Sequence, residues 1–230
     1  MVESQKLSSI GTLTTGVAHQ LNNPLNNIST SCQIALDDFD GGDSAFIKKM
    51  LRNIEQETFR ARDVVQGLLE FARVKDFELH PANLRDVVDR SIKLVKSQVP
   101  SAVTIAVEIP DKLILPMDAQ RIQEVMITMI INASQAITGE GKISILASNK
   151  KETDEAVIEI KDTGSGISDE IMDHIFDPFY TTKEEGQGTG LGLSIAYGII
   201  QKHNGTIEVE SRPDEDTVFR IRLPLMPENA

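Results

Sequence analysis

The sequence predicts an α+β protein in which an antiparallel helical hairpin is followed by an α/β sandwich with a mixed sheet. Two patterns lead to this fold class. Apolar residues recur at steps of three and four from about residue 4 to residue 74, which is typical of long amphipathic helices. Beyond Pro81, helical segments alternate with short segments that show strand alternation, which is typical of helices packed on a sheet.

The predicted hairpin has helices over about residues 4–38 and 44–74. Between them, Asp40-Gly41-Gly42-Asp43-Ser44 reads as a loop, with Ser44 as the expected N-cap of the second helix. Cys32 lies on the apolar stripe of the first helix, where we expect a small core residue. Because a single hairpin leaves half of each stripe in water, we expect a homodimer in which two hairpins form a four-helix bundle.

The first helix carries His19 two residues beyond Val17 of the apolar stripe, so this histidine points sideways, to solvent or to a docking partner. Pro24 has no N–H to donate to the carbonyl of Gln20, so the helix should bend within a turn of His19. A lone histidine in a helix is more often a tolerated surface residue. That interpretation applies to the other histidines, His80, His174 and His203.

The pattern changes near Lys75 to Pro81, which predicts one domain over residues 1–76 and a second over residues 77–230. Tight turns such as Gly139-Glu140-Gly141 between strands favour a largely antiparallel sheet with helices on one face. Between Gly164 and Gly190 the sequence has little regular pattern, which usually indicates a functional lid or disorder. Expected helices are 84–96, 118–137, 169–175 and 189–203, and expected strands are 103–109, 142–148, 156–162, 206–211 and 217–223.

Composition excludes several functions. A formal net charge of −12 argues against a nucleic-acid partner or an anionic membrane surface. The single cysteine excludes an internal disulfide and fits a reducing compartment. No apolar run approaches the roughly 20 residues that span a bilayer, and the first residues show no apolar h-region of a signal peptide. We therefore expect a cytoplasmic chain without direct membrane contact. Its abrupt helical start suggests a piece of a larger protein, such as the cytoplasmic part of a membrane-bound one.

Three features of the second domain point to a bound nucleotide. Asn132 interrupts an apolar helix, and its amide oxygen could ligate a hard cation such as Mg²⁺. Asp162 ends a strand just before a glycine turn and can accept a hydrogen bond from an exocyclic amine. The glycine-rich segment 186–193 opens a helix, so its N–H groups can close around phosphate oxygens. Each feature alone is more often structural, and only their combination is specific.

With His19, these features resemble the transmitter portion of a two-component sensor histidine kinase over nearly the whole chain. His19 with Asn23-Pro24-Leu25 matches the phosphoacceptor box of that family, and Asn132 matches its N box. Three further boxes follow in order: Asp162, Gly164 and Gly166 in the first glycine box, Phe176 to Lys183 in the phenylalanine box, and Gly188, Gly190 and Gly192 in the second glycine box.

The resemblance implies a dimerisation and phosphotransfer hairpin followed by an ATP-binding domain of the Bergerat type. It implies an ATP-dependent protein-histidine kinase that phosphorylates His19 and then passes the phosphoryl group to an aspartate of a response-regulator receiver. By this resemblance Asn132 would hold Mg²⁺ and Asp162 would contact the adenine amine. The full set implied for ATP is Asn132, Asp162, Gly164, Gly166, Lys183, Gly188, Thr189, Gly190, Leu191 and Gly192.

Residues of the long segment have two interpretations each. Lys183 could reach the phosphates or be a solvated residue of the lid. Phe176 and Phe179 are expected to anchor the lid against the domain rather than to touch nucleotide, as a clamp that releases when ATP leaves.

Two residues depart from the family pattern. Gln20 follows His19 where the family usually has an acidic residue. A carboxylate there would hold the Nδ1 proton and offset the charge of the phospho-imidazolium, so we expect slower transfer or another base. Thr128 lies one turn before Asn132, where the N box often has another asparagine, which should weaken one metal or phosphate contact.

Alternatives to a kinase stay open. Asn23 shares the face of His19, and in related proteins such an amide orients water that hydrolyses the phosphorylated receiver, although it could merely be a polar residue near a bend. Receiver phosphatase activity is therefore a second hypothesis. A third is an ATP-binding conformational switch without phosphotransfer, and a fourth is a dimeric scaffold with a degenerate ATP site.

Overall fold

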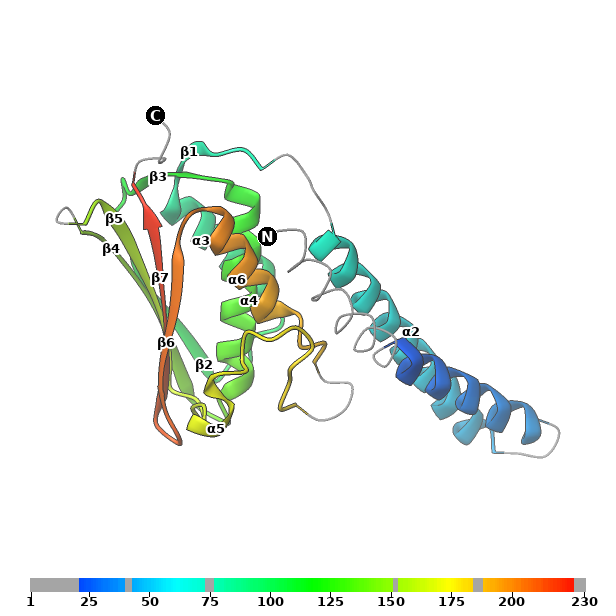
Figure 1. Cartoon of the computed structure of the whole chain (residues 1–230). Helices are drawn as coiled ribbons and strands as arrows, with labels where there is room; N and C mark the ends of the chain where they lie inside the picture. Colours follow the sequence, from blue (N-terminus) through cyan, green and yellow to red (C-terminus); the bar gives the residue numbers. More distant parts are fainter. Residues whose placement is uncertain (1–20, 40–42, 73–76, 151–152, 184–187, 226–230) are drawn as a thin grey trace. The chain divides into compact units, whose positions relative to one another are not determined.

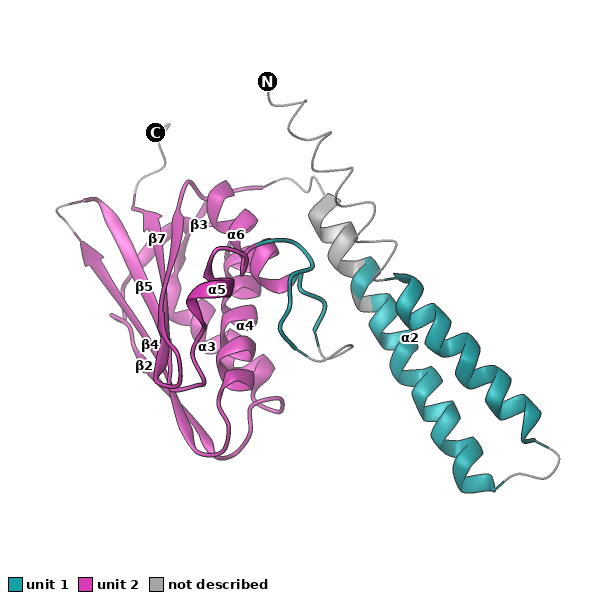
Figure 2. Cartoon of the chain, turned by 60° about the horizontal axis from the view of Figure 1, so that its bottom comes forward, with its two compact units in different colours: residues 1–73, 177–191 teal, residues 74–176, 192–230 magenta. Residues whose placement is uncertain are grey.

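The computed structural model describes residues 21–39, 43–72, 77–150, 153–183 and 188–225 of the 230-residue chain. The chain divides into two compact units, one of residues 1–73 and 177–191 and the other of residues 74–176 and 192–230 (Figure 2). Residues 177–191, called the lid segment below, overlap the C-terminal part of the predicted lid between Gly164 and Gly190. They belong to the predicted second domain but group with the hairpin in this division. The domain limits at residues 76 and 77 stay a prediction.

The hairpin consists of a first helix over residues 21–37 and helix α2, Ser44–Ala72, which run antiparallel (Figure 1). The N-cap of α2 is Asp43 and not Ser44 as predicted. Asp43 accepts the N–H of Ala45 on Oδ1 at 3.0 Å, and its carbonyl accepts the N–H of Phe46 at 2.9 Å. A carboxylate satisfies the free N–H groups of the first turn and adds a favourable charge at the positive end of the helix.

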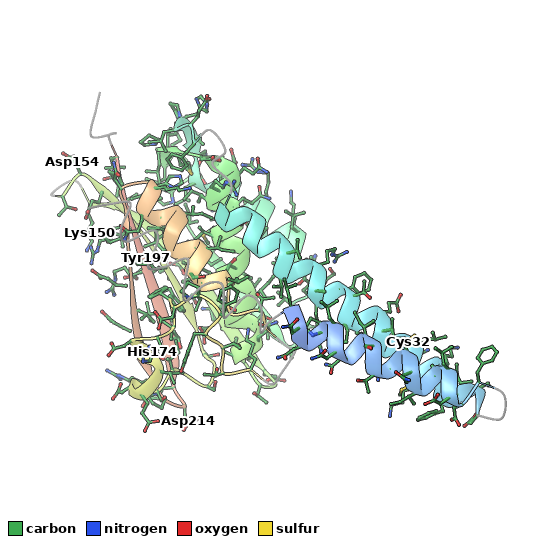
Figure 3. The ribbon with its side chains drawn as sticks, turned by 45° about the vertical axis from the view of Figure 1, so that its right-hand side comes forward. Cys32, Lys150, Asp154, His174, Tyr197 and Asp214 are labelled. Atoms are coloured by element: carbon green, nitrogen blue, oxygen red, sulfur yellow. The ribbon has the colours of Figure 1, made fainter. Side chains whose placement is uncertain are left out.

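Burial in the hairpin corrects the expected position of Cys32. Its side chain is exposed (Figure 3), as is Leu36 of the same stripe at 68%. The buried positions of the first helix include Ser31 and Ala35, each one residue before a member of the predicted stripe. The periodicity was correct, but the stripe is not the surface that the single hairpin buries. The predicted bend at Pro24 stays a prediction, because its carbonyl partner lies outside the described residues.

The second unit is built on a five-stranded mixed sheet of order β2-β4-β5-β7-β6. Strands β2 and β4 are parallel, and the other neighbours are antiparallel, which confirms the predicted fold class. The β6–β7 connection is a tight turn, but Gly139 to Gly141 connects a helix to β4 and not two strands. The strands are β2 (Val103–Glu108), β4 (Gly141–Lys150), β5 (Glu155–Asp162), β6 (Thr206–Arg212) and β7 (Asp216–Pro224).

A second sheet escaped prediction. Strands β1, His80–Asn83, and β3, Ile114–Met117, pair antiparallel, with Pro81 opposite Pro116. Proline cannot donate to a strand ladder and weakens the sequence signal for a strand, and each of these strands is only four residues long. The pair therefore depends on tertiary packing rather than on local preference.

Three helices cover one face of the large sheet: α3 (Leu84–Val95), α4 (Ala119–Ala136) and α6 (Gly192–Lys202) (Figure 1). The core between them contains fully buried side chains of α4, such as Met126 and Ile130, and alternate residues of the strands, such as Ile143 and Ile158. Helix α6 begins later than predicted, because Gly190 has φ +65° and cannot lie in a right-handed helix. The short helix α5 is Asp169–Met172.

His203 is a core residue, which corrects its predicted surface position. It is 2% exposed at the end of α6, where its Nε2 accepts the N–H of Asp118 at 3.1 Å and its Nδ1 donates to the carbonyl of Ile199 at 2.8 Å. The ring packs edge-on against Phe77 with centroids 4.6 Å apart. Burial lowers the pKa of His203, so the ring is neutral and links α6 to the start of α4. The predicted surface histidines are exposed: His80 and His174.

Within the described parts of the chain, no helix combines the length and apolar character needed to cross a membrane.

Candidate active site

The first glycine turn begins at Asp162, the last residue of β5, which is 3% exposed. Its Oδ1 accepts the N–H of Gly164 at 2.8 Å. Gly164 lies against the end of α4, because a Cβ there would be 2.7 Å from Cβ of Ala136. The N–H of Ser165 also donates to the carbonyl of Ala136 at 3.0 Å. The turn is therefore seated directly on the last turn of α4.

The environment of Asp162 is prepared for a hydrogen-bond donor. Burial raises the pKa of this carboxyl group, the N–H of Gly164 partly offsets that rise, and the negative charge of Asp216 adds to it. A carboxylate has about four acceptor positions, so the bond from Gly164 leaves capacity for another donor. A neutral amine that donates to this carboxylate would compensate part of the unfavourable burial.

Asn132 lies on a stripe of α4 that is flanked by glycines at both ends. Thr128, Asn132 and Ala136 follow one another at steps of four and share one face of the helix. Ala136 meets Gly164, and the methyl group of Thr128 lies 3.1 Å from where a Cβ of Gly192 would be. Asn132 is half-buried between these two close approaches. Thr128, the predicted departure from the family pattern, packs against the start of α6.

A backbone hydrogen bond within the lid segment holds the second glycine box. The N–H of Phe179 donates to the carbonyl of Gly190 at 2.9 Å, and both residues have positive φ, +70° and +65°. A Cβ at Gly190 would lie 2.3 Å from the carbonyl carbon of Phe179, so no other residue fits there without a shift. Lys183 is half-buried in this segment, and burial lowers its pKa.

Phe176 is the last residue of the second unit before the lid segment begins. Its ring packs on that of Tyr197 of α6 with centroids 5.3 Å apart. Phe176 also packs against the hydrophobic core, as expected for an anchor. Phe179 instead contacts Gly190 through its backbone, so the two phenylalanines differ in what holds them.

The predicted site residues fall into three groups. The phosphoacceptor His19 and its neighbour Gln20 lie outside the described residues, and Asn23 is half-buried in the first helix. The second unit contains Asn132, Asp162, Gly164, Gly166 and Gly192, and the lid segment contains Lys183, Gly188, Thr189, Gly190 and Leu191.

Sequence reasoning missed Ala136 and Ser211, which hold the first glycine turn by its backbone. No side-chain pattern could have revealed them, because a backbone N–H or carbonyl carries no sequence signature. Among the described residues, no group of three or more His, Cys, Asp or Glu side chains is arranged to hold a metal ion.

Two family models match the chain. The "His Kinase A (phospho-acceptor) domain" matches residues 9–76, and the "Histidine kinase-, DNA gyrase B-, and HSP90-like ATPase" matches residues 117–227. The second model covers α4, the glycine turns and the large sheet from β4 onward, so fold and site define an ATP-binding domain of this class.

Relatives extend the match to nearly the whole chain. The sensor kinase CckA of Brucella abortus is 33% identical over 97% of this chain and 25% of its own length. The kinase AtoS of Escherichia coli is 33% identical over 99% of this chain and 37% of its own. The kinase ZraS of Escherichia coli is 33% identical over 98% of this chain and 48% of its own. The chain thus spans between a quarter and a half of these curated relatives.

Solved structures agree with this class. The catalytic domain of histidine kinase ThkA is 31% identical, covers 66% of this chain and 99% of its own, and has a TM-score of 0.59. ThkA in complex with response regulator protein TrrA is 27% identical, covers 99% of this chain and 65% of its own, and has a TM-score of 0.80. The chain belongs to the sensor histidine kinase family and corresponds to the transmitter region of its members.

Proposed function

We propose that this chain is a kinase core that phosphorylates His19 from Mg·ATP and passes the phosphoryl group to an aspartate of a response-regulator receiver. The observation that carries the proposal is the buried Asp162 beside a glycine turn that is seated on the Asn132 helix, in a domain of the matched ATPase class. The match of residues 9–76 to a phosphoacceptor domain supports the proposal that this segment, which contains His19, accepts the phosphoryl group.

The nucleotide would be held from the adenine end by Asp162, whose carboxylate accepts a hydrogen bond from the exocyclic amine. The residues present fit Mg²⁺ with phosphates, because Asn132 offers an oxygen ligand of the kind this cation prefers. Mg²⁺, when bound, would neutralise negative charge on the phosphate oxygens. A triphosphate near Lys183 would favour its protonated form and so oppose the effect of burial.

In the transfer step, one nitrogen of the neutral His19 ring attacks the γ-phosphorus, the bond to the bridging oxygen breaks and ADP leaves with that electron pair. The other ring nitrogen keeps its proton, and the amide oxygen of Gln20 can accept a hydrogen bond from it. Gln20 adds no negative charge to offset the phospho-imidazolium. Catalysis would therefore rest on positioning and on charge neutralisation around the phosphates.

The test is incubation with γ-labelled ATP, followed by acid treatment. Wild type should take up acid-labile label, His19→Ala should take up none, and His174→Ala, which removes an exposed histidine, should behave as wild type. A chain that binds nucleotide but never labels His19, even with its natural stimulus, would favour the alternative of an ATP-binding switch.

The partner proposed for the second step is a receiver that docks on the hairpin. ThkA, whose structure matches 99% of this chain and 65% of its own, was solved in complex with a response regulator. The described hairpin has a polar hollow that both helices line, and its first lining residue follows His19 by eight positions in the sequence. Its lining residues are Asn27, Thr30, Ser31, Asn53 and Glu57.

Receiver phosphatase activity is a second proposal, because Asn23 follows His19 by four residues, a spacing that would put both on one helix face, and is half-buried. Asn23→Ala should slow dephosphorylation of a phosphorylated receiver while leaving phosphorylation of His19 intact. Equal dephosphorylation rates in Asn23→Ala and wild type would exclude this role.

A further inference from the structure

The tip of the β6–β7 hairpin contacts the first glycine turn as well, in addition to α4. The N–H of Ile167 donates to Oγ of Ser211 at 2.8 Å, and the N–H of Asp214 donates to the carbonyl of Ser165 at 2.8 Å. Figure 3 shows Asp214 at this tip. Gly166, at φ +70°, lies so close that a Cβ would be 2.2 Å from the carbonyl oxygen of Arg212. The turn is thus held by two elements that are distant in sequence.

Ser211 is the side chain that makes this contact, and its hydroxyl group is fully used. It donates to the carbonyl of Asp216 at 2.9 Å and lies 2.9 Å from Oγ1 of Thr217. A hydroxyl group has one hydrogen and two lone pairs. With its hydrogen on Asp216, the N–H of Ile167 and the O–H of Thr217 occupy both lone pairs. One oxygen atom therefore joins β6, β7 and the glycine turn.

The register of the sheet relates Ser211 to the proposed adenine contact. Asp162 of β5 lies opposite Thr217 of β7, and Thr217 lies opposite Ser211 of β6. The three residues form one row across the sheet. Ser211 therefore connects both ends of the turn: through this row to Asp162, where the turn begins, and through its own oxygen to Ile167, where the turn ends.

We propose that Ser211 is a positioning residue for purine selection, which rests on the proposed ATP-binding function. Its hydroxyl group sets the separation between the Asp162 carboxylate and the backbone of residues 164–167. A carboxylate selects adenine by accepting from its amine, whereas the guanine carbonyl at the same place repels it, so selection depends on how closely the base is held against Asp162. Without the hydroxyl group, the N–H of Ile167 loses its acceptor and the turn can move away.

The experiment compares variants of the full chain by ATP and GTP titration, by the kinetics of His19 labelling and by thermal unfolding. Ser211→Ala should raise the KM for ATP on the order of tenfold, with kcat within about twofold, because an unsatisfied N–H has an effect of that order. Weak GTP binding should change little, so the ATP-over-GTP preference falls by about the same factor. Ser211→Thr keeps the hydroxyl group and should restore most of the preference.

Ser91→Ala is the matched control. Ser91 is fully buried in α3, and its Oγ donates to the carbonyl of Val87 at 2.8 Å, away from the glycine turn. This variant should lower the unfolding temperature without changing the ATP-over-GTP preference. If Ser211→Ala also changes only the unfolding temperature, Ser211 is merely structural and the proposal is wrong.

Two further outcomes separate this inference from the proposed function. If Ser211→Ala does not fold, Ser211→Cys keeps the volume with a much weaker acceptor, and its nucleotide preference must fall for the proposal to hold. A wild type that binds neither ATP nor GTP would overturn the proposed function and this inference together. A wild type that prefers ATP, with variants that keep the same preference, would overturn this inference alone.

Discussion

The hairpin and the second unit, residues 74–176 and 192–230 and called the ATPase domain below, differ in how completely each buries its apolar side chains. In the ATPase domain the helices and the large sheet enclose a continuous set of buried apolar side chains. In the described hairpin, large apolar side chains stay exposed along both helices, and elsewhere few do. Those of the hairpin are Leu25, Ile34, Leu36, Phe39, Phe46, Leu51, Phe59 and Val65; those of the ATPase domain are Leu94, Ile114 and Tyr197.

The inner face of the hairpin mixes apolar and polar side chains. Besides Ala35, Met50 and Val64, its buried residues include Ser31 and Glu57. Few side chains of the described hairpin are fully buried, and helix stability in proteins comes mostly from packing. The second unit thus encloses its own core, whereas the described part of the hairpin leaves large apolar side chains exposed, which supports the expected homodimer.

The largest effect is expected from a charge on the exposed apolar surface of the hairpin. Leu36→Glu should weaken the dimer by at least about 100-fold, because a two-fold interface counts each lost leucine twice and burying a leucine contributes about 1.5–3 kcal/mol. Sedimentation equilibrium of wild type and variant measures this. Leu94→Glu changes a leucine of the ATPase domain that is 58% exposed, against 68% for Leu36, and should leave the dimer unaffected. Equal dimer stability in all three proteins would remove the distinction between the regions.

Asp162→Asn should separate stability from binding within the ATPase domain. The amide still accepts the N–H of Gly164, but it removes a buried charge, whose raised pKa shows that the ionised form is unfavourable there. The unfolding temperature without nucleotide should therefore stay equal or rise, while ATP affinity falls about 10–100-fold. Calorimetric titration and thermal unfolding check the two parts. The exposed Asp111→Asn should change neither, and a variant that retained wild-type ATP affinity would exclude Asp162 as the adenine contact.

A carboxylate next to His19 should affect phosphoryl transfer without affecting nucleotide binding. Gln20→Glu would supply a carboxylate beside His19 and should speed labelling of His19 by a few-fold, because a charge-assisted hydrogen bond is roughly twice as strong as a neutral one. ATP affinity, which depends on the other region, should not change. Initial labelling rates between about pH 6 and pH 9 measure the effect. A rate that is unchanged over this whole range would show that the missing carboxylate does not limit transfer.

How much the sequence could predict also differs between the regions. In the ATPase domain, periodicity gave α4 and the strands of the large sheet to within a few residues, and the glycine turns lie where their spacing predicted. In the hairpin the period was right, but the stripe through Cys32 is exposed in the single chain. Periodicity identifies an apolar stripe without saying which surface covers it.

The residues that sequence reasoning missed are defined by tertiary contacts. His203 reads as a polar residue at a helix end, and only its bonds to Asp118 and Ile199 explain why it is buried. Ser211 reads as one more polar residue of a strand, and its role depends on a backbone N–H that arrives from residue 167. Patterns of side chains predict elements and boxes, but they do not predict which backbone groups need a partner.

The smallest expected effect concerns the pH dependence of the ATPase domain. Burial lowers the pKa of His203, so between that value and the unfolded value near 6.5 the unfolded chain binds more protons than the folded one. Stability is therefore complete above about pH 6.5 and is lost as the pH falls toward the folded pKa. The carboxylate of Asp118 opposes this loss, and the raised pKa of Asp162 adds an effect of opposite sign at lower pH.

His203→Gln should remove this contribution and so flatten the fall in unfolding free energy between about pH 7.5 and pH 5.5 by up to about 1.4 kcal/mol. Urea unfolding followed by circular dichroism measures the slope. His80→Gln changes an exposed histidine of the same domain and should keep the wild-type slope. If His203→Gln also keeps that slope, the ring does not stay neutral in the core, and the link that it makes between α6 and α4 would have to tolerate a proton on Nε2, where the N–H of Asp118 now points.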